Sequence, residues 1–491
     1  MQRITSAAAL PLFDIAAARR MEQAAAAGLA PHTLMQRAGL AVARLAMATA
    51  PQARTIWVAC GPGNNGGDGF EAAAQLQRRG FATVVTRIGD ESRLPSDARA
   101  SLQNARDSGV QFSNAPPEHP DLAIDALLGI GTTRPPDGLM MDWLRRMHAA
   151  RSPVLSVDTP SGLNADTGTL SADFLATPAS GIPGFRRLCL SLLTLKPGLF
   201  TAQGRDAAGD VWFDDLGVAP GNEAPVARLQ GTSPAPVRWQ SSHKGSYGDV
   251  AVIGGARGMA GAGLLAASAA LNAGAGRVFA ALLDTDIAPL DFVQPELMFR
   301  GHESLDLGAM TVVCGCGGGS AVLEALPLVV ETARALVLDA DALNAIAGDS
   351  ALQGLLISRC RTGLPTVLTP HPLEAARLLG AATRDVQNDR IGSANRLAER
   401  YGAVVVLKGS GTVIAHGGET PVINTSGNAR LATAGTGDVL AGMVGAALAA
   451  GRPAMAAACE AVWRHGDLAD RWPEHIPLSA SALARGLPAR P

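Results

Sequence analysis

The segment from residue 55 to residue 88 limits the possible folds more than any other part of the chain. Residues 55–59 (TIWVA) and 82–88 are short β-rich runs, and residues 70–79 between them have a helical pattern. The glycine-rich segment 61–69 (GPGNNGGDG) follows the first run. A strand, a glycine loop, a helix and a second strand form a βαβ unit, with the loop at the carboxyl end of the first strand. This segment predicts an open, parallel α/β sheet.

The glycine loop carries polar groups that a tight turn does not need. It is not G-x-G-x-x-G, and it lacks the Gly-Lys-Ser/Thr ending of a P-loop, so a standard dinucleotide or nucleoside triphosphate site is not supported. It offers two amides, Asn64 and Asn65, and a carboxylate, Asp68. A structural turn accounts for some of the glycines, but the amides and the carboxylate together favour a functional loop.

Two further β-rich runs of the first half end in carboxylates. Residues 122–125 (LAID) end at Asp125, and residues 154–158 (VLSVD) end at Asp158, three residues before Ser161. Ligands bind beyond the carboxyl ends of parallel strands, so these loops should converge. Amide, carboxylate and hydroxyl oxygens suit a hard cation, and Asp68 or Asp158 can serve as an acid or base. The alternative is that each Asp only caps a turn.

The totals describe a globular protein of more than one domain. At 491 residues the chain is long enough for two or three domains, and 47% apolar residues are ample for their cores. A net charge of −2 offers no basic field for nucleic acid. Residues 218–237 are rich in proline and read as a linker. The expected domains are therefore residues 1–217 and 238–491.

The second half repeats the alternation of strands and helices. A glycine-rich start at 243–255 (HKGSYGDVAVIGG) leads into a Gly/Ala-rich helix at 261–274. This alternation predicts a mostly parallel sheet covered by helices. Further strand-like runs occur at 277–283, 310–314, 335–339, 365–369 and 403–407.

Two segments of the second half suggest phosphate chemistry. In 434–438 (AGTGD), glycines and a hydroxyl precede Asp438 and an apolar helical run, and a helix start binds anions. Asp438 can accept a proton there, although the helix dipole alone also favours an Asp in a first turn. Lys408 and the small residues up to Thr412 form a second cradle. His371, between two prolines, is either a turn residue or a ligand contact.

Lysine is rare in this chain, and its positions are informative. Of the 41 basic residues only Lys196, Lys244 and Lys408 are lysines, and each precedes Gly or Pro-Gly. Where a surface cation suffices the chain uses Arg, so these lysines are candidates for sites that need a compact ammonium. The alternative is that these three lysines remain at their positions by chance.

Cysteines and apolar stretches bear on metals and compartment. The six cysteines are scattered, and no second Cys or His pair stands at zinc spacing. Scattered thiols fit a reducing compartment, and the apolar run before Asp14 is too short for a convincing signal peptide. The Gly/Ala-rich stretches at 262–283 and 439–451 do not read as membrane spans. We expect a cytoplasmic protein with neither nucleic acid nor membrane as partner.

Several motifs, in order, resemble one known family along almost the whole chain. In the first half GPGNNGGDG (61–69), IDALLGIG (124–131) and VDTPSGL (157–163) resemble the NAD(P)H-hydrate epimerase domain. The second half resembles the ADP/ATP-dependent NAD(P)H-hydrate dehydratase, which has a ribokinase-like fold. Its motifs are HKGSYGDVAVIGG (243–255), LTPHPLE (368–374), VVLKGSGT (405–412) and ATAGTGDVLAG (432–442). The chain thus resembles the bifunctional NAD(P)H-hydrate repair enzymes.

The resemblance implies a fold and two reactions. The fold is an N-terminal Rossmann-like three-layer domain followed by a ribokinase-like α/β domain. The substrates, NADHX and NADPHX, carry a hydroxyl at C6 of the reduced nicotinamide ring. The epimerase interconverts their R and S forms, and the dehydratase removes water from the S form with ADP or ATP. Phosphoryl transfer to the hydroxyl and loss of phosphate, with Asp438 as base, is a coherent hypothesis. Mg²⁺ with the nucleotide and a homo-oligomer are also expected.

The resemblance also implies site residues. Potassium would be bound by Asn65, Asp125 and Ser161 in the epimerase domain. The hydrate would be held by Asn64, Asn65, Gly66, Gly67, Asp68, Gly129, Ile130, Gly131, Thr132, Thr133, Arg134, Pro135 and Asp158, with Asp68 or Asp158 as proton carrier. In the second half the nucleotide would be held by Lys408, Gly409, Ser410, Gly411, Thr412 and Gly437. The substrate there would be lined by Ala262, Gly317, His371 and Asp438.

Two other functions fit the same residues. A ribokinase-type small-molecule kinase fused to a Rossmann-like domain would leave a stably phosphorylated product. A non-catalytic binding protein would use its first half only as an interaction module. Neither alternative predicts the return of reduced nicotinamide from its hydrate, so that product separates the repair enzyme from both. A stably phosphorylated product indicates the kinase, whereas unchanged hydrate epimerisation in Asp125→Ala and Asp158→Ala variants of a purified first half indicates the non-catalytic protein.

Overall fold

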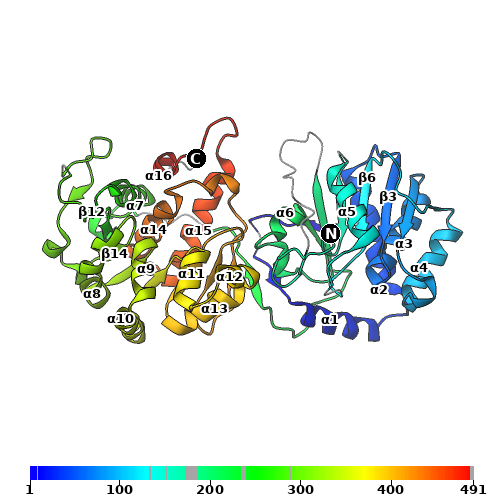
Figure 1. Ribbon diagram of the computed structural model, residues 1–491, viewed down its shortest axis with the longest axis horizontal. Helices are drawn as coiled ribbons and strands as arrows, with labels where there is room; N and C mark the ends of the chain where they lie inside the picture. Colours follow the sequence, from blue (N-terminus) through cyan, green and yellow to red (C-terminus); the bar gives the residue numbers. More distant parts are fainter. Residues whose placement is uncertain are drawn as a thin grey trace. The chain divides into compact units, whose positions relative to one another are not determined.

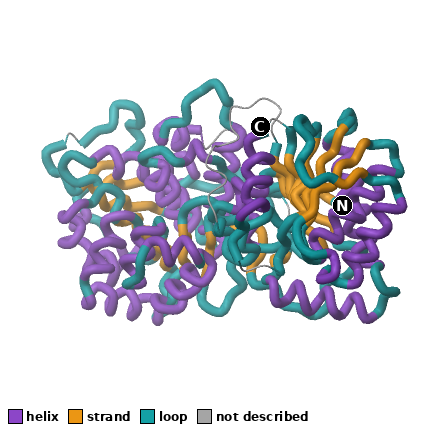
Figure 2. Tube along the Cα trace, turned by 45° about the vertical axis from the view of Figure 1, so that its right-hand side comes forward, coloured by secondary structure: helices purple, strands orange, loops and turns teal. Residues whose placement is uncertain are grey.

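The chain forms two compact units in a computed structural model (Figure 1). The structure describes residues 1–7, 9–131, 134–150, 152–171, 186–233, 239–287 and 289–486. The first unit comprises Met1–Thr5 and Pro11–Ala227, and the second comprises Ser6–Leu10 and Arg228–Pro491. Each unit contains strands flanked by helices (Figure 2).

The first unit is a mostly parallel α/β sheet. The strands follow the order β1-β9-β8-β7-β6-β3-β4-β5, and all neighbours are parallel except β1 and β9. The strands of this sheet are β1 (Gln2–Arg3), β3 (Thr55–Cys60), β4 (Ala82–Arg87), β5 (Gln111–Phe112), β6 (Leu122–Ala126), β7 (Val154–Val157), β8 (Arg187–Leu192) and β9 (Asp210–Asp214). The two-residue strand β2 (Pro11–Leu12) is not part of this sheet. Its helices are α1 (Ile15–Ala27), α2 (Thr33–Thr49), α3 (Asn64–Gln77), α4 (Ser96–Asp107), α5 (Gly138–Ala149) and α6 (Gly204–Ala208).

Strand β3 shows why this sheet is covered on both faces. Ile56, Val58 and Cys60 pack in a core with helices α2, α3 and α4. Trp57 and Ala59, on the opposite face of the strand, pack with helix α5. Alternate side chains point to opposite faces of a strand, so a strand that is apolar on both faces needs helices on both sides. The result is the expected three-layer arrangement.

The order of strands fixes where ligands bind in this unit. After β3 the chain adds β4 on one side and later β6 on the other. In open α/β sheets the crevice at such a reversal, beyond the carboxyl ends of the strands, is the usual ligand site. The glycine loop after β3 and Asp125 in β6 both lie at this end.

The helix after β3 begins earlier than the sequence pattern predicts. The pattern gives a loop over 61–69 and a helix from residue 70, whereas α3 starts at Asn64 and includes Gly66, Gly67 and Gly69. The reason is close packing. A Cβ on Gly66 would lie 2.0 Å from the Gly61 carbonyl oxygen, and one on Gly69 would lie 2.6 Å from Ala126 Cβ. The glycines allow a helix to pack directly on the strands, although glycine is a poor helix former.

The second unit is also a mostly parallel sheet. The strands run β13-β12-β11-β14-β15-β16-β17 in parallel, and then β18 and β19 turn antiparallel, with β10 parallel to β19. The strands are β10 (Ala227–Leu229), β11 (Asp249–Gly254), β12 (Arg277–Leu282), β13 (Met298–Phe299), β14 (Thr311–Cys314), β15 (Ala335–Leu338), β16 (Thr366–Leu368), β17 (Val404–Leu407), β18 (Val413–Ala415) and β19 (Val422–Ile423). The helices are α7 (Ala260–Ala273), α8 (Val322–Thr332), α9 (Ala340–Gly348), α10 (Ser350–Arg361), α11 (Pro372–Leu379), α12 (Thr383–Asn388), α13 (Arg390–Tyr401), α14 (Thr436–Ala449), α15 (Ala454–Arg471) and α16 (Ala480–Gly486).

Helices cover both faces of this second sheet as well. One face packs against α7, α14, α15 and α16 in a core that contains Val250 and Val252 of β11. Helices α8 and α13 contact β14 and β17 in addition. The expected fold class, an N-terminal Rossmann-like three-layer domain followed by a ribokinase-like α/β domain, is confirmed.

The proline-rich stretch 218–237 is not irregular throughout. Strand β10 lies within it, and residues 234–237 are outside the described part of the chain. In the described ranges, no helix combines the length and the apolar character needed to cross a membrane.

Candidate functional site

A cavity of about 590 Å³ lies beyond the strand ends of the first unit. The structure brings seven of the expected substrate residues together in its wall: Asn64, Asn65, Asp68, Gly129, Ile130, Gly131 and Asp158. Arg134 and Pro135 are not among its lining residues, and neither are Gly66 and Gly67. Thr132 and Thr133 lie outside the described residues.

Gly66 and Gly67 serve packing in this structure. Gly66 lies against Gly61, as described above, and a Cβ on Gly67 would lie 2.6 Å from the sulfur of Met35. Both glycines are buried in the first turns of α3. These two glycines therefore allow the start of the helix to pack against the protein interior. Asn64, Asn65 and Asp68 are the residues of this turn that line the cavity.

Asp158 and Lys196 form a buried ion pair in the wall of the cavity. The Lys196 ammonium donates to Asp158 Oδ1 and, at 2.7 Å, to the Leu192 carbonyl. The Leu192 N–H donates to the same carboxylate oxygen at 3.1 Å. Asp158 has a left-handed backbone, φ +64°, which side chains rarely adopt and which marks strain held by surrounding structure. Lys196 is 1% exposed, so its charge depends on Asp158.

Asp68 stands near this pair with different electrostatics. Burial raises the pKa of Asp68 well above its ordinary value, and the charges of Asp158 and Glu22 raise it further. Two neighbouring carboxyl groups in different environments take different protonation states, which is the usual arrangement for acid–base work. Asp68 can therefore hold a proton beside the anionic Asp158.

Asp125 and Ser161 meet directly at the expected cation site. The Ser161 hydroxyl donates to Asp125 Oδ1 at 2.6 Å, and the Ser161 N–H donates to Oδ2 at 2.9 Å. Burial raises the pKa of Asp125, since its charge is taken out of water. Asn65 lines the 590 Å³ cavity, of which neither Asp125 nor Ser161 is a lining residue, and its buried amide Nδ2 lacks a hydrogen-bond partner. Buried polar atoms are nearly always paired, so this amide is a candidate ligand contact.

In the second unit Lys408 and Asp339 form another buried pair. Lys408 Nζ lies 2.6 Å from Asp339 Oδ1, which also accepts from the Thr369 hydroxyl at 2.9 Å. Burial alone would lower the pKa of Lys408, but the charges of Asp339 and Glu374 raise it above the ordinary value. The ammonium also lies 3.4 Å from where a Gly437 Cβ would be, so glycine leaves room for it at the start of α14.

Helix α14 presents an anion site beside this lysine. Gly435, with φ +90°, precedes the helix, which begins at Thr436. In the described chain the Gly437 and Asp438 N–H groups have no backbone or side-chain acceptor. Free N–H groups at a helix start bind phosphate, and the ammonium adds a positive charge. The two segments that the sequence singled out thus converge.

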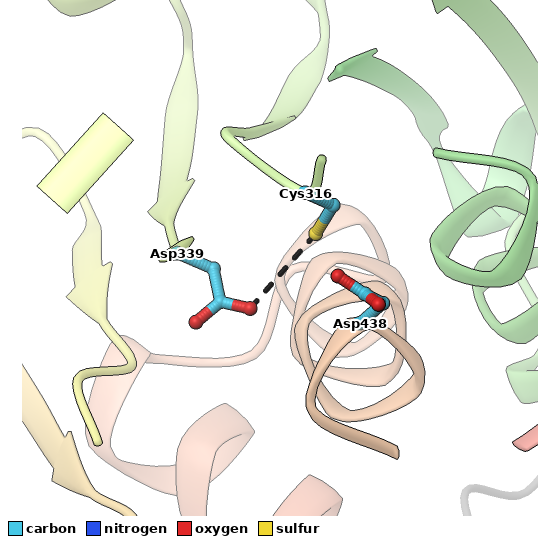
Figure 3. A group of neighbouring side chains, drawn as sticks. All are labelled: Cys316, Asp339 and Asp438. Atoms are coloured by element: carbon cyan, nitrogen blue, oxygen red, sulfur yellow. Dashed lines mark hydrogen bonds between the residues drawn. The ribbon is translucent and has the colours of Figure 1, made fainter. Parts of the chain in front are cut away.

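Asp438 lies in a cluster with Cys316 and Asp339 (Figure 3). The three side chains each present a ligand-type atom within 4.8 Å of the others, and the Cys316 thiol donates to Asp339 Oδ2 at 3.9 Å. Burial and then the charge of Asp339 raise the pKa of Asp438 to about 6. A carboxylate with that pKa is a suitable general base near neutral pH. The mixed sulfur and oxygen set is not the oxygen-only set that Mg²⁺ prefers.

The loop from Lys408 to Thr412 is shaped by a buried arginine. Arg390 is 1% exposed, and its guanidinium donates to the carbonyls of Leu407, at 3.2 Å, and Lys408, at 3.1 Å. Gly409, with φ +128°, lies against the guanidinium, where a Cβ would approach to 3.1 Å. The Thr412 hydroxyl donates to the Gly409 carbonyl at 3.2 Å. The loop is therefore preformed and positions Lys408.

The remaining expected residues of the second half have structural partners. His371 caps helix α11, because its Nδ1 accepts the N–H groups of Leu373 and Glu374 at 3.1 and 3.2 Å. His371 therefore has the role of a turn residue. Burial lowers the pKa of His371, and the nearby charge of Lys408 lowers it further. Ala262 and Gly317 are neighbours, since a Cβ on Gly317 would lie 2.7 Å from Ala262 Cβ.

Several groups of these sites were not among the residues expected from the sequence. Cys316 was not singled out, because it and its near neighbour Cys314 have no second Cys or His pair at zinc spacing to accompany them. Lys196 did give one: like Lys408, it is a rare lysine, and both are paired with a buried aspartate. Lys244 is exposed, so for this lysine scarcity does not mark a buried ion pair. Arg390 acts through the loop that it holds, and Asp339 acts through its direct contacts with Lys408 and Cys316.

Two parallel-sheet units, each with an aspartate–lysine pair beside a second carboxylate at its strand ends, define a two-domain α/β enzyme. A family model described as NAD(P)H-hydrate dehydratase matches residues 250–486, and one described as YjeF-related protein N-terminus matches residues 31–196. The bifunctional NAD(P)H-hydrate repair enzyme Nnr of Escherichia coli (strain K12) is 36% identical over 470 residues, covering 92% of this chain and 88% of that protein. The chain belongs to the family of bifunctional NAD(P)H-hydrate repair enzymes.

Other similar proteins match the second half. The ADP-dependent (S)-NAD(P)H-hydrate dehydratase of Neisseria meningitidis serogroup B is 43% identical over 255 residues, covering 50% of this chain and 84% of that protein. A crystal structure of the ADP/ATP-dependent NAD(P)H-hydrate dehydratase from Bacillus subtilis, co-crystallised with ATP and Mg²⁺, is 29% identical. It has a TM-score of 0.42 and covers 52% of this chain and 92% of its own.

Proposed function

We propose that this protein repairs hydrated NADH and NADPH by two activities. The first unit interconverts the R and S hydrates, and the second unit dehydrates the S form with an adenine nucleotide, ADP or ATP. We assign epimerisation to residues 1–217 and dehydration to residues 238–491, with 218–237 as the connection. The observation that carries the proposal is the meeting of Lys408, the free N–H groups of α14 and Asp438 in a chain of this family.

The second-unit geometry supports phosphoryl transfer followed by elimination. Asp438 accepts the proton of the C6 hydroxyl, and the oxygen attacks the terminal phosphorus of the nucleotide as the bond from that phosphorus to the departing nucleotide, ADP from ATP or AMP from ADP, breaks. Lys408 and the α14 N–H groups stabilise the negative charge on the phosphoryl group. The C6–O bond then breaks with loss of phosphate and a neighbouring ring proton, which restores the ring double bond. Phosphate is a better leaving group than hydroxide.

The first-unit geometry supports acid–base chemistry on the same carbon. Asp158, held by Lys196, is the anionic group, and Asp68 is the protonated one. One accepts and the other donates a proton while the hydroxyl at C6 is released and returned on the opposite face. Asn64, Asn65 and the segment 129–131 line the cavity that would hold the nicotinamide nucleotide.

The residues at Asp125 fit a potassium ion. A cation there would offset the buried carboxylate of Asp125, and Ser161 and Asn65 supply neutral oxygens. Turning the Asn65 amide by half a rotation exchanges the unpartnered Nδ2 for an oxygen ligand. Mg²⁺ would enter with the nucleotide phosphates rather than through a dedicated protein cage.

The setting of the enzyme is part of the proposal. All six cysteines are free, which suits a reducing cytoplasm. A homo-oligomer is compatible with Gly/Ala-rich helices such as α7, and a sedimentation measurement decides it.

The test is incubation of the whole protein with mixed R and S hydrates and ADP or ATP. We expect both epimers to return as reduced nicotinamide, measured by its absorbance, with release of free phosphate. Conversion of the S form alone removes the epimerase from the proposal. A stable phosphorylated product without recovered absorbance supports the kinase alternative instead.

A further inference from the structure

The first-unit cavity has few positive charges for a dinucleotide substrate. Its charged lining residues are Arg19, Glu22, Asp68, Asp97, Asp158 and Lys196. Lys196 already forms an ion pair with Asp158, and the ring of His32 is hydrogen-bonded to the Ser101 hydroxyl at 2.7 Å. A substrate with a pyrophosphate brings two negative charges into this predominantly acidic wall, so some other cation must meet them.

Arg19 is the cation that remains. It lies on α1, is exposed, and has no hydrogen-bond or ion-pair partner among the described residues. Its nearest acidic neighbour in sequence is Glu22, one helical turn away, and the charge of Arg19 lowers the pKa of Glu22 that burial raises. The adjacent Arg20 differs, because it makes a two-pronged pair with Glu223 at 2.9 and 2.7 Å. Only one of the two neighbouring arginines is available to a ligand.

Arg19 and the start of helix α3 both border the short segment 129–131. A guanidinium nitrogen of Arg19 lies 4.0 Å from where a Gly131 Cβ would be, and Asn65 lies 3.2 Å from where a Gly129 Cβ would be. Two residue steps span about 7 Å, a distance that a pyrophosphate group can bridge. At the other end, the N–H groups of residues 64–66, which open the 14-residue helix α3, have no acceptor within the described ranges.

We propose that Arg19 binds the pyrophosphate of the hydrated dinucleotide, opposite the start of helix α3. The inference rests on the function proposed above for the first unit and adds a specificity residue to it. The helix N-terminus supplies directed N–H donors, and the guanidinium supplies a planar fork for phosphate oxygens. Arg19 contacts the pyrophosphate and not the reacting ring in this arrangement, so it contributes binding that is equal in the ground and transition states.

The experiment compares Arg19→Ala with the matched control Arg20→Ala in the full-length chain. Pure R hydrate is supplied with ADP and an excess of a separate S-specific dehydratase, so that epimerisation limits the return of absorbance. We expect Arg19→Ala to raise KM about tenfold with kcat within about twofold, and Arg19→Lys to lie between. Arg20→Ala should match the wild type. Equal KM values for the two alanine variants, or a fall in kcat alone, overturn the inference.

Two further readouts isolate the pyrophosphate itself. Hydrated reduced nicotinamide riboside lacks phosphate, so its kcat/KM should be the same in the wild type and in Arg19→Ala. Inorganic pyrophosphate, titrated by calorimetry, should bind Arg19→Ala about tenfold more weakly than Arg20→Ala at the first-unit site. The second unit is identical in both variants, so the difference belongs to the first. If the wild type does not epimerise, the proposed function fails, and equal pyrophosphate affinities then reject the Arg19 site separately.

Discussion

The ammonium of Lys408 donates to one oxygen of Asp339 at 2.6 Å, while the other oxygen of that carboxylate accepts from the Cys316 thiol (Figure 3). Asp339 therefore neutralises the lysine before any nucleotide arrives. A phosphate that enters at the start of α14 meets directed N–H groups and a lysine whose position is already fixed. Preorganised donors of this kind need no rearrangement at the moment of reaction.

Replacement of Lys408 by methionine separates its two roles. Lys408→Met leaves the Asp339 carboxylate, which is 1% exposed, without its cation. Breaking a buried ion pair typically costs about 3–5 kcal/mol, so denaturant unfolding of the second unit should show a loss of that order. The double variant Lys408→Met with Asp339→Asn should recover most of the stability but not the dehydratase activity. Recovery of both in the double variant would show that Lys408 is only structural.

Asp438→Asn tests the proposed base. Dehydration should fall at least about 100-fold, because the hydroxyl proton has no acceptor, while nucleotide binding and epimerisation stay largely unchanged. The control is Asp385→Asn on the exposed surface of α12, which should leave both activities intact. The folded pKa of Asp438, about 6, lies above its ordinary value of 3.8, so ionisation of this group destabilises the folded state at pH 8. The Asn variant should therefore be more stable there, by about 1–2 kcal/mol after solvent screening.

The pH dependence of dehydration follows from the same carboxyl group. A base must be deprotonated, so kcat/KM should decline as the pH falls below about 6, approaching a tenfold loss per pH unit. An unshifted Asp would keep its activity down to about pH 4. Rates measured from pH 4.5 to 8, with saturating nucleotide, locate the acidic limb of the pH profile, where kcat/KM declines. A limb near pH 4 would show that the Asp438 pKa is not raised in solution.

Cys316 should set the position of that limb. Its contact with Asp438 lowers the pKa of Asp438, which burial and Asp339 raise. Cys316→Ala removes the thiol donor, so the acidic limb should move to higher pH, and Cys316→Ser, which keeps a donor, should move it less. Cys314 is the matched control, a buried cysteine whose pKa is raised to about 12 by burial alone. Equal pH profiles for Cys316→Ala and Cys314→Ala would contradict the role of the thiol.

The pattern of apolar runs predicts most of this fold, because buried parallel strands need continuous apolar segments. The runs at 55–59, 335–339 and 403–407 correspond to β3, β15 and β17. The predicted start of α3 was wrong, because glycines that allow a helix to pack closely look like loop residues in a sequence. Short strands such as β10 and β13 carry too few residues for a pattern.

The site was predictable where a motif or a rare residue marked it. Lys408 and Asp438 were singled out by glycines and by scarcity of lysine, and they lie together. Their partners were not predictable in the same way. Asp339 lies 69 residues from Lys408, and Asp158 lies 38 residues from Lys196, so only the packing of the sheet brings each pair together.

Asp158→Asn tests the charge of the first-unit pair without disturbing the backbone. Asp158 has φ +64°, a conformation that asparagine tolerates better than most residues, so the variant should keep the turn. It should lose at least about 100-fold of its epimerisation rate, measured as R-to-S conversion above the spontaneous rate. The buried Lys196 loses its anion, so the first unit should also unfold at lower denaturant. Adding Lys196→Met should restore the stability and leave the epimerase inactive. Full activity in Asp158→Asn would assign the proton transfer to Asp68 alone.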